Sequence, residues 1–109
     1  MKKYEIVKTN NEFNDIINSG TYIKNKYYSI YYKKSDLDFP KFGLAVSKKC
    51  GNAVERNKIK RQLRNIIDNH KKLFSNNMNY IIMVRKGIID ISFNQMEEYL
   101  VNLISRKEK

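Results

Sequence analysis

Most of the residues in this sequence whose side chains could do chemistry are basic: there are 17 lysines and five arginines. Three of the arginines, Arg56, Arg61 and Arg64, fall within nine residues. An arginine guanidinium is planar and donates paired hydrogen bonds to phosphate oxygens, which a lysine ammonium does not. Clustered arginines in a chain that otherwise prefers lysine therefore predict a site that binds phosphate groups.

The segment from Lys48 to Arg64 holds seven basic residues and one acid, Glu55, so it carries +6 of the net charge of +11. Arg56, Lys60 and Arg64 recur at the four-residue spacing that places like charges side by side on a helix, where they repel each other. Two interpretations stay open for this segment. It could be a solvated helix face, but the arginine enrichment and the scarcity of acids favour a surface with an anionic partner.

Catalytic and metal-ligating residue types are sparse and scattered. A protein nuclease would need a cluster of carboxylates for metal ions, or a histidine or lysine placed for acid–base catalysis. This sequence has one histidine, one cysteine and dispersed acids. His70 falls among apolar helix positions, and Cys50 suits a buried thiol. We therefore assign no catalytic role to His70 or Cys50, and a single cysteine predicts no zinc site that needs several thiolates.

Composition limits the class of protein without identifying the partner. The 109 residues, 41% of them hydrophobic, suffice for one domain, residues 1–109, with a modest core. A pI near 9.8 predicts a polyanionic partner, either a nucleic acid or an anionic membrane surface. No apolar run approaches the ~20 residues of a bilayer span, and no signal peptide is evident, so we expect a cytoplasmic protein.

Hydrophobic periodicity and capping residues predict the elements that must position the basic segment. In chain order they are a helix, two strand segments, a helix, a strand and a helix. Their ranges are Thr9–Asn18, Thr21–Lys34, Phe42–Val46, Ala53–Phe74, Tyr80–Val84 and a last helix from about Ser92. This order is typical of an α+β domain in which helices cover one sheet.

Alternation in the first two strand segments predicts one core face and one wet face. In the first segment the wet face would consist of Tyr27, Ser29, Tyr31 and Lys33, opposite Tyr28, Ile30 and Tyr32. In the second, the small residues Gly43 and Ala45 alternate with larger apolar ones. If the strands are neighbours, small residues beside tyrosine rings would form a trough that a nucleic acid strand can approach closely.

The run from Gly43 to Arg64, GLAVSKKCGNAVERNKIKRQLR, resembles the signature of the protein component of bacterial ribonuclease P. In that family a Gly-Asn-Ala-Val segment leads into an Arg-Asn-Arg motif and a basic helix. This chain has Lys58 where the third residue of the motif is usually arginine. The resemblance extends over essentially the whole chain, from a first helix ending at Gly20 to the closing helix.

The resemblance implies a fold that periodicity alone does not define. It is a single-domain α-β sandwich with the element order αβββαβα and a four-stranded sheet, related in topology to a ribosomal-protein domain. The family includes a left-handed βαβ crossover. Since such crossovers are generally right-handed, this expectation comes from the resemblance only.

The resemblance also implies a function in tRNA processing. The protein would bind the catalytic RNA of ribonuclease P, the ribonucleoprotein endonuclease that hydrolyses a phosphodiester bond to remove the 5′ leader of precursor tRNA. Catalysis would belong to the RNA, with Mg²⁺ held mainly by RNA groups. The partners would be that RNA and precursor tRNA, with no membrane, and the protein itself would be monomeric.

Matching this sequence to the family pattern position by position implies two groups of site residues. The catalytic RNA would be bound by Lys48, Lys49, Asn52, Arg56, Asn57, Lys58, Lys60, Arg61 and Arg64. The single-stranded leader would be held in a central cleft by Phe13, Ile17, Tyr31 and Ala45. Ile17 departs from the family pattern, in which an aromatic residue often stands, and it offers apolar contact in place of stacking.

Two alternative functions stay open. A purely structural RNA-binding protein of the ribosomal type would also have a basic helix and a small α/β domain. A self-sufficient protein nuclease would cleave RNA without an RNA subunit.

Overall fold

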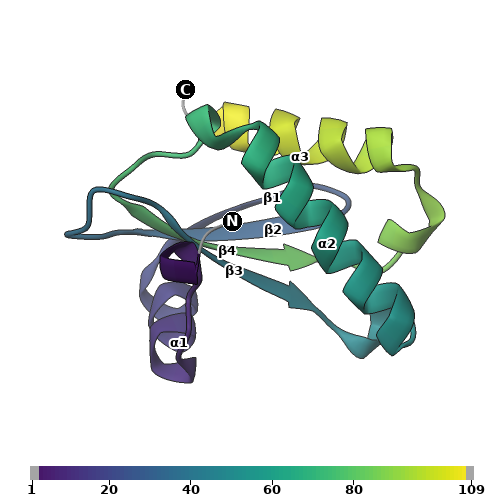
Figure 1. The fold of residues 1–109 in the computed structure, drawn as a ribbon, viewed down its shortest axis with the longest axis horizontal. Coiled ribbons are helices and arrows are strands. Elements are labelled where there is room, and N and C mark those ends of the chain that lie inside the picture. The colour runs from purple at the N-terminus through teal and green to yellow at the C-terminus, as the bar shows by residue number, and fades with distance from the viewer. Residues whose placement is uncertain (1–2, 108–109) are drawn as a thin grey trace.

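A four-stranded sheet lies between α1 on one side and α2 and α3 on the other (Figure 1). The computed structural model describes residues 3–107, and the side chains of residues 4–106. The helices and strands are α1 (Asn10–Ser19), β1 (Thr21–Lys24), β2 (Tyr28–Lys34), β3 (Lys41–Val46), α2 (Ala53–Asn69), β4 (Met78–Val84) and α3 (Phe93–Lys107). Short 3₁₀ turns are η1 (Lys3–Glu5), η2 (Lys48–Cys50), η3 (Lys71–Leu73) and η4 (Ile88–Asp90). The predicted order αβββαβα is confirmed.

The strands lie in the order β1-β2-β4-β3, with β4 in the interior of the sheet as its apolar sequence predicts. β1 pairs antiparallel with β2, and β2 pairs antiparallel with β4. β3 and β4 are parallel, so α2 is the crossover helix between them. The handedness of this crossover stays a prediction.

The tyrosine-rich segment is a hairpin of two strands rather than one continuous run. Asn25 makes the turn, because its side-chain oxygen accepts hydrogen bonds from the backbone N–H groups of Tyr27 (3.0 Å) and Tyr28 (2.9 Å). Tyr27 therefore precedes β2 and does not follow the alternation of the strand. Its ring is buried, with its centroid 4.7 Å from that of Tyr99, so the prediction of a wet Tyr27 is wrong.

The main core lies between the sheet and the two longer helices. Tyr28 is fully buried there, and its hydroxyl donates a 3.0 Å hydrogen bond to the Met96 carbonyl. Burial raises the pKa of the Tyr28 hydroxyl. α2 ends at Asn69 and not at the predicted Phe74, because the chain leaves the helix and turns through η3. This turn packs the Phe74 ring edge-on against the ring of Phe42, at 5.0 Å between centroids.

α1 covers only part of the opposite face of the sheet. Its N-cap is Thr9, whose hydroxyl accepts a hydrogen bond from the Glu12 backbone N–H, as predicted. Ile16 is the one fully buried residue of this helix. α1 ends at Ser19, and its C-cap is Gly20, where a Cβ would lie 2.6 Å from the Tyr32 carbonyl oxygen, so the close approach of two backbones requires glycine here. The rest of this face is not covered by any described helix.

Candidate nucleic-acid interface

The start of α2 is held by a reciprocal capping box. The Asn52 side-chain oxygen accepts from the Glu55 backbone N–H, and a Glu55 carboxylate oxygen accepts from the Asn52 backbone N–H, both at 2.9 Å. The sequence predicts that Asn52 binds RNA, and the structure places its side-chain oxygen in the cap. The cap sets the rotation of every side chain that follows along the helix.

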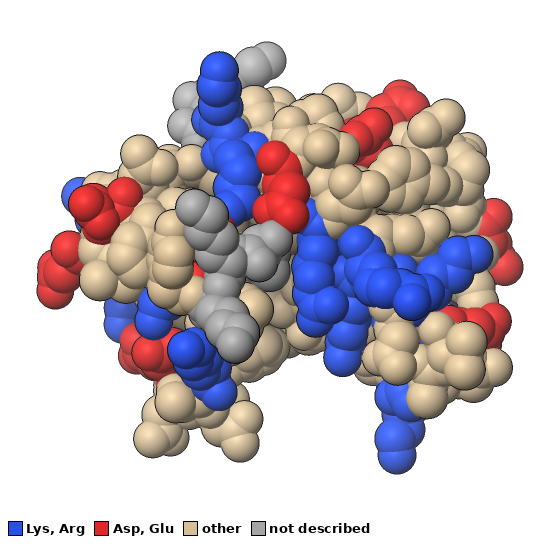
Figure 2. Space-filling model, viewed as in Figure 1, with Lys and Arg blue, Asp and Glu red and all other residues tan. Residues whose placement is uncertain are grey.

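α2 buries one side and exposes a basic one. Ile59, Leu63, Ile66 and Ile67 pack into the core. The exposed side chains of Asn57, Arg61 and Arg64 lie away from them; we call these three residues the basic face. Figure 2 shows Lys and Arg side chains gathered in one broad patch over α2. The predicted division of this helix into an apolar arc and a basic arc is confirmed.

None of the basic residues between 48 and 64 forms an ion pair among the described side chains. Lys48 and Lys49 are exposed in η2, directly before the capping box. Arg56 is half-buried, and its Nε lies 3.4 Å from the Asn52 carbonyl oxygen. Uncompensated like charges destabilise a helix, so this arrangement favours an anionic ligand.

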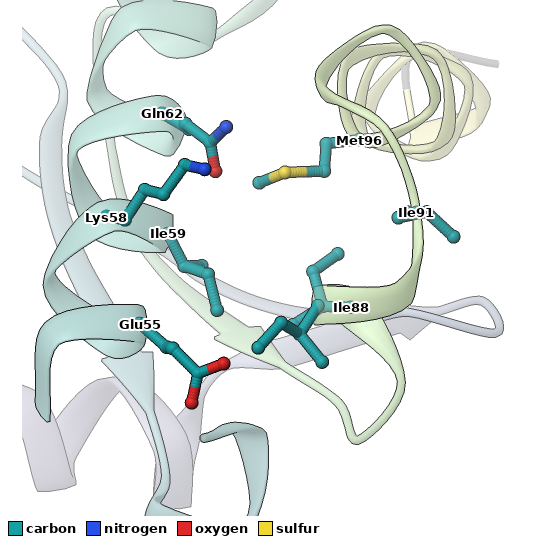
Figure 3. Close-up of a pocket in the computed structure, with 8 residues that line it drawn as sticks. Glu55, Lys58, Ile59, Gln62, Ile88, Ile91 and Met96 are labelled. Atoms are coloured by element: carbon teal, nitrogen blue, oxygen red, sulfur yellow. The ribbon is translucent and has the colours of Figure 1, made fainter. Parts of the chain in front are cut away.

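The two flanks of α2 carry different cations. Lys60 and Arg64 lie on the flank next to β3, where they line a groove of about 160 Å³ together with Phe13 and Gly43. Lys58 lies on the other flank, where it lines a separate pocket facing η4 and the start of α3 (Figure 3). Lys58 therefore lies on a different flank of α2 from Lys60 and Arg64, while Arg61 follows it by three residues on the helix.

The cleft lies on the sheet face that α1 covers in part, and Gly43 and Ile81 are buried there beside Phe13. Tyr31 of β2 pairs with Ile81 of β4, and Ile81 pairs with Gly43 of β3. Two residues further along the strands, Ala45 pairs with Met83. Since paired residues share a face, the small residues and Tyr31 lie on one surface, as the alternation predicts.

A hollow of about 540 Å³ extends this face around the edge of β3. Ser29, Ala45 and Met83 line it, as does Lys60 of α2. Lys60 also lines the groove beside Phe13. It therefore stands at the junction between the cleft and the helix that carries the basic face.

All four predicted leader-binding residues, Phe13, Ile17, Tyr31 and Ala45, are half-buried. Phe13 projects from α1 onto the backbone of β3, because a Cβ at position 43 would lie 3.1 Å from its ring. Ile17 follows one turn later on α1. Phe13 thus packs partly as a structural residue while it forms one wall of the cleft.

Tyr22 is a candidate binding residue that sequence reasoning missed. It pairs with Tyr31 across β1 and β2, and the two ring centroids are 5.4 Å apart with a tilt of 30°. Tyr22 is 53% exposed, which is high for a tyrosine in a sheet. Recognition of the hairpin at Asn25 would have placed it beside Tyr31. The cleft therefore offers two adjacent aromatic rings for stacking.

Gly43→Ala tests the close packing at the cleft wall. A Cβ at this position would lie 2.6 Å from Cδ1 of Ile81, which is fully buried. Overpacking of this kind costs about 1–3 kcal/mol, so we expect the free energy of unfolding to fall by this amount in urea denaturation. Ala45→Ser, which adds one atom to the more open part of the same face, is the control. Equal stability of the two variants would contradict this packing.

Two ion pairs fasten α1 to the sheet. Lys33 of β2 lies 2.7 Å from Asp15, and Lys41 of β3 lies 3.6 Å from Glu12. The hydrogen bond from Lys33 lowers the pKa of the Asp15 carboxyl below its ordinary 3.8. The ionised carboxylate is therefore favoured in the folded state.

Asp15→Asn is expected to flatten the dependence of stability on acid pH. A lowered folded-state pKa contributes stability above pH 3.8, which is lost as the pH falls through the folded-state value. Chemical denaturation at several pH values should show a smaller loss below pH 3.8 in the variant than in the wild type. Asp38→Asn removes an exposed loop carboxylate that forms no ion pair with a described residue, and it should leave the profile unchanged. An identical profile for Asp15→Asn would show that this pair contributes nothing.

The side chains of Cys50 and His70, the cysteine and the histidine of this sequence, both contact other residues of the folded chain. The Cys50 thiol is buried and donates to the Val84 carbonyl oxygen at 3.6 Å. His70 is half-buried, with its Nε2 3.2 Å from a Glu97 carboxylate oxygen. Within the described residues, no three His, Cys, Asp or Glu side chains come together as metal ligands. No helix in this part of the chain is long and apolar enough to span a bilayer.

The amino-acid sequence matches a protein-family model described as Ribonuclease P over residues 1–108. A protein named ribonuclease P protein component from Mycoplasma mycoides subsp. mycoides is 41% identical over 105 residues, covering 95% of this chain and 96% of its own length. A protein of the same name from Mesoplasma florum is 38% identical over 107 residues and covers 97% of both chains.

Solved structures show the same fold. A Staphylococcus aureus RNase P protein mutant with defective mRNA degradation activity aligns with a TM-score of 0.91 at 30% identity, covering 97% of this chain and 90% of that one. The RNase P protein from Thermotoga maritima aligns with a TM-score of 0.86 at 27% identity, covering 94% of this chain and 96% of that one.

Proposed function

Because this chain belongs to the family of ribonuclease P protein components, the protein subunits of that endoribonuclease, we propose that it docks on the ribonuclease P RNA through α2 and holds precursor tRNA in the cleft. Family membership makes the RNA subunit its partner and tRNA processing its context. Which surface binds which RNA is the content of the proposal. The proposal also includes a cytoplasmic location and a monomeric state for the protein.

The observation that carries the proposal is the set of unpaired cations on η2 and α2. Seven basic residues stand between positions 48 and 64, and no described carboxylate pairs with any of them. A phosphodiester backbone supplies the missing charges and releases counterions on binding. Arg61 and Arg64 in the basic face would make the paired contacts to phosphate oxygens.

The cleft suits a single strand rather than a duplex. Its aromatic rings, Tyr31 and Tyr22, lie next to each other, and stacking on such rings is open to any base. Ala45, a small half-buried residue on the same face, lets a strand approach the backbone of the sheet. Lys60, at the junction, would contact the phosphates where the leader passes from the cleft toward the RNA subunit.

The division of labour places the chemistry on the RNA subunit. Mg²⁺ would be held mainly by RNA groups and would supply the activated water and the charge stabilisation of phosphodiester hydrolysis. The residues of this chain would orient the leader and bring cations near the phosphate backbones. The protein thereby assists a reaction that it does not itself catalyse.

Reconstitution with transcribed ribonuclease P RNA tests the proposal. The protein should lower the Mg²⁺ concentration needed for cleavage and tighten the binding of precursor tRNA relative to mature tRNA. A failure on both measures would overturn the proposed roles and leave a purely structural RNA-binding protein. Cleavage of precursor tRNA by the purified, RNA-free chain would instead support a protein nuclease.

A further inference from the structure

A pocket of about 150 Å³ lies on the flank of α2 that faces away from β3 (Figure 3). Its walls are apolar, and its rim is polar. The walls are formed by Ile59, Ile88, Ile89, Ile91 and Met96, and the rim by Glu55, Lys58 and Gln62. In Figure 3, Ile59 and Ile88 point into the space from opposite sides, and Met96 closes it from the side of α3.

Two apolar side chains near this pocket have no role in the core. Ile89 lines the pocket and is 44% exposed, although the neighbouring Ile88 is buried. Val54 is 76% exposed and stands one helical turn before Lys58 on the same side of α2, outside the lining of the pocket. Exposed apolar residues that cluster beside a pocket often mark a surface that contacts another molecule.

The rim of the pocket carries one cation, Lys58, and one carboxylate, Glu55. Lys58 has no hydrogen bond or ion pair with any described residue. Glu55 also lies at the rim, but one of its carboxylate oxygens is occupied in the capping box with Asn52. In Figure 3 the Lys58 side chain extends from α2 toward the Gln62 amide at the rim. Gln62 adds an amide that can donate and accept hydrogen bonds.

We propose that this pocket receives one unpaired base of the RNA that docks on α2, with the phosphate of that nucleotide on Lys58. Apolar walls suit the faces of a base, the Gln62 amide suits its polar edge, and Lys58 suits its phosphate. The pocket opens on the same helix as the basic face, so an RNA lying on α2 passes beside it. The inference rests on the proposed function of that helix. It also gives a physical role to lysine at position 58, whose ammonium would meet the phosphate at the rim.

Crosslinking tests which molecule enters the pocket. In a Cys50→Ala background, Ile89→Cys is labelled with a photoactivatable azide and assembled with transcribed ribonuclease P RNA. We expect a crosslink to an unpaired nucleotide, mapped by reverse transcription. Leu37→Cys, labelled identically at a residue that is 38% exposed in the loop before β3, is the control. If the Ile89 probe crosslinks RNA no better than the Leu37 probe, the pocket holds no base.

Binding measurements separate this inference from the proposal on which it rests. Ile89→Ser should weaken the affinity for the RNA subunit by about tenfold without changing its salt dependence, because it removes apolar contact and no charge. Lys58→Gln should lower the slope of log affinity against log salt by about one. Wild-type affinity of Ile89→Ser, while Arg61→Ala/Arg64→Ala still weakens binding, overturns the pocket alone. If the arginine variant also binds normally, the RNA-binding role of α2 falls.

The pocket could instead be occupied by a second copy of this chain, and sedimentation distinguishes this from a bound base. Sedimentation that shows a dimer of the free protein, absent in Ile89→Ser, would assign the pocket to protein contact and overturn the base. Thermal unfolding of Ile89→Ser should match the wild type, since the side chain is half-exposed.

Discussion

Arg61→Ala/Arg64→Ala should bind the ribonuclease P RNA roughly 100-fold more weakly than the wild type. Both side chains are exposed on the basic face, and neither pairs with a described carboxylate. A charge-assisted hydrogen bond contributes about 1.5 kcal/mol or more, which is roughly tenfold in affinity for each arginine. The slope of log affinity against log salt should fall by about one for each arginine that no longer neutralises a phosphate. A filter-binding titration at several salt concentrations measures both quantities.

The control removes the same charge from a different surface. Lys34→Ala/Lys72→Ala lowers the net charge equally at two exposed residues outside α2. It should weaken binding only slightly at low salt. If this control loses as much affinity as the arginine variant, the RNA responds to net charge and not to the basic face. An unchanged slope in the arginine variant would show that this face is only solvated.

Tyr31→Ala should selectively weaken the binding of substrates that carry a leader. Stacking of a base on an aromatic ring contributes about 1–3 kcal/mol, so we expect a loss of roughly 5- to 150-fold in the affinity of the holoenzyme for precursor tRNA. Binding of mature tRNA and of the RNA subunit should stay near the wild-type values, because Tyr31 lies on the opposite face of the sheet from α2.

Tyr31→Phe is the matched control, since it keeps the ring and removes only the hydroxyl. It should bind precursor tRNA almost as well as the wild type. Tyr22→Ala should show a smaller loss of the same kind, because Tyr22 is the more exposed ring of the pair. If mature and precursor tRNA lose affinity equally in Tyr31→Ala, the leader does not lie in the cleft.

Much of the fold could be predicted because local signals and packing agree. The capping residues Thr9 and Asn52 begin helices where expected, and the apolar run that ends at Val84 forms a strand in the interior of the sheet. Periodicity missed the hairpin because its turn depends on one side chain, Asn25, which accepts two backbone hydrogen bonds. Alternation counts residues along one strand and carries no information about where a side chain interrupts it.

The sequence predicted which residues of the candidate site are basic or aromatic better than it predicted how they are arranged in space. A helical period places Arg61 and Arg64 away from Ile59, and the structure agrees. It does not indicate which neighbour lies on each flank, because that depends on long-range packing. Lys60 meets β3 and Lys58 meets η4 only because the parallel crossover lays α2 beside the edge strand. The uncovered part of the sheet likewise follows from the short length of α1.

The capping box at Asn52 limits where related chains can gain or lose residues. A helix turns by about 100° per residue, so one residue inserted between Glu55 and Ile59 would rotate the arginines toward the core and the isoleucines toward water. The loop between β2 and β3, with exposed Asp36, Leu37 and Asp38, has no such constraint. Insertions and deletions in evolution should therefore accumulate in this loop and be absent from the first turns of α2.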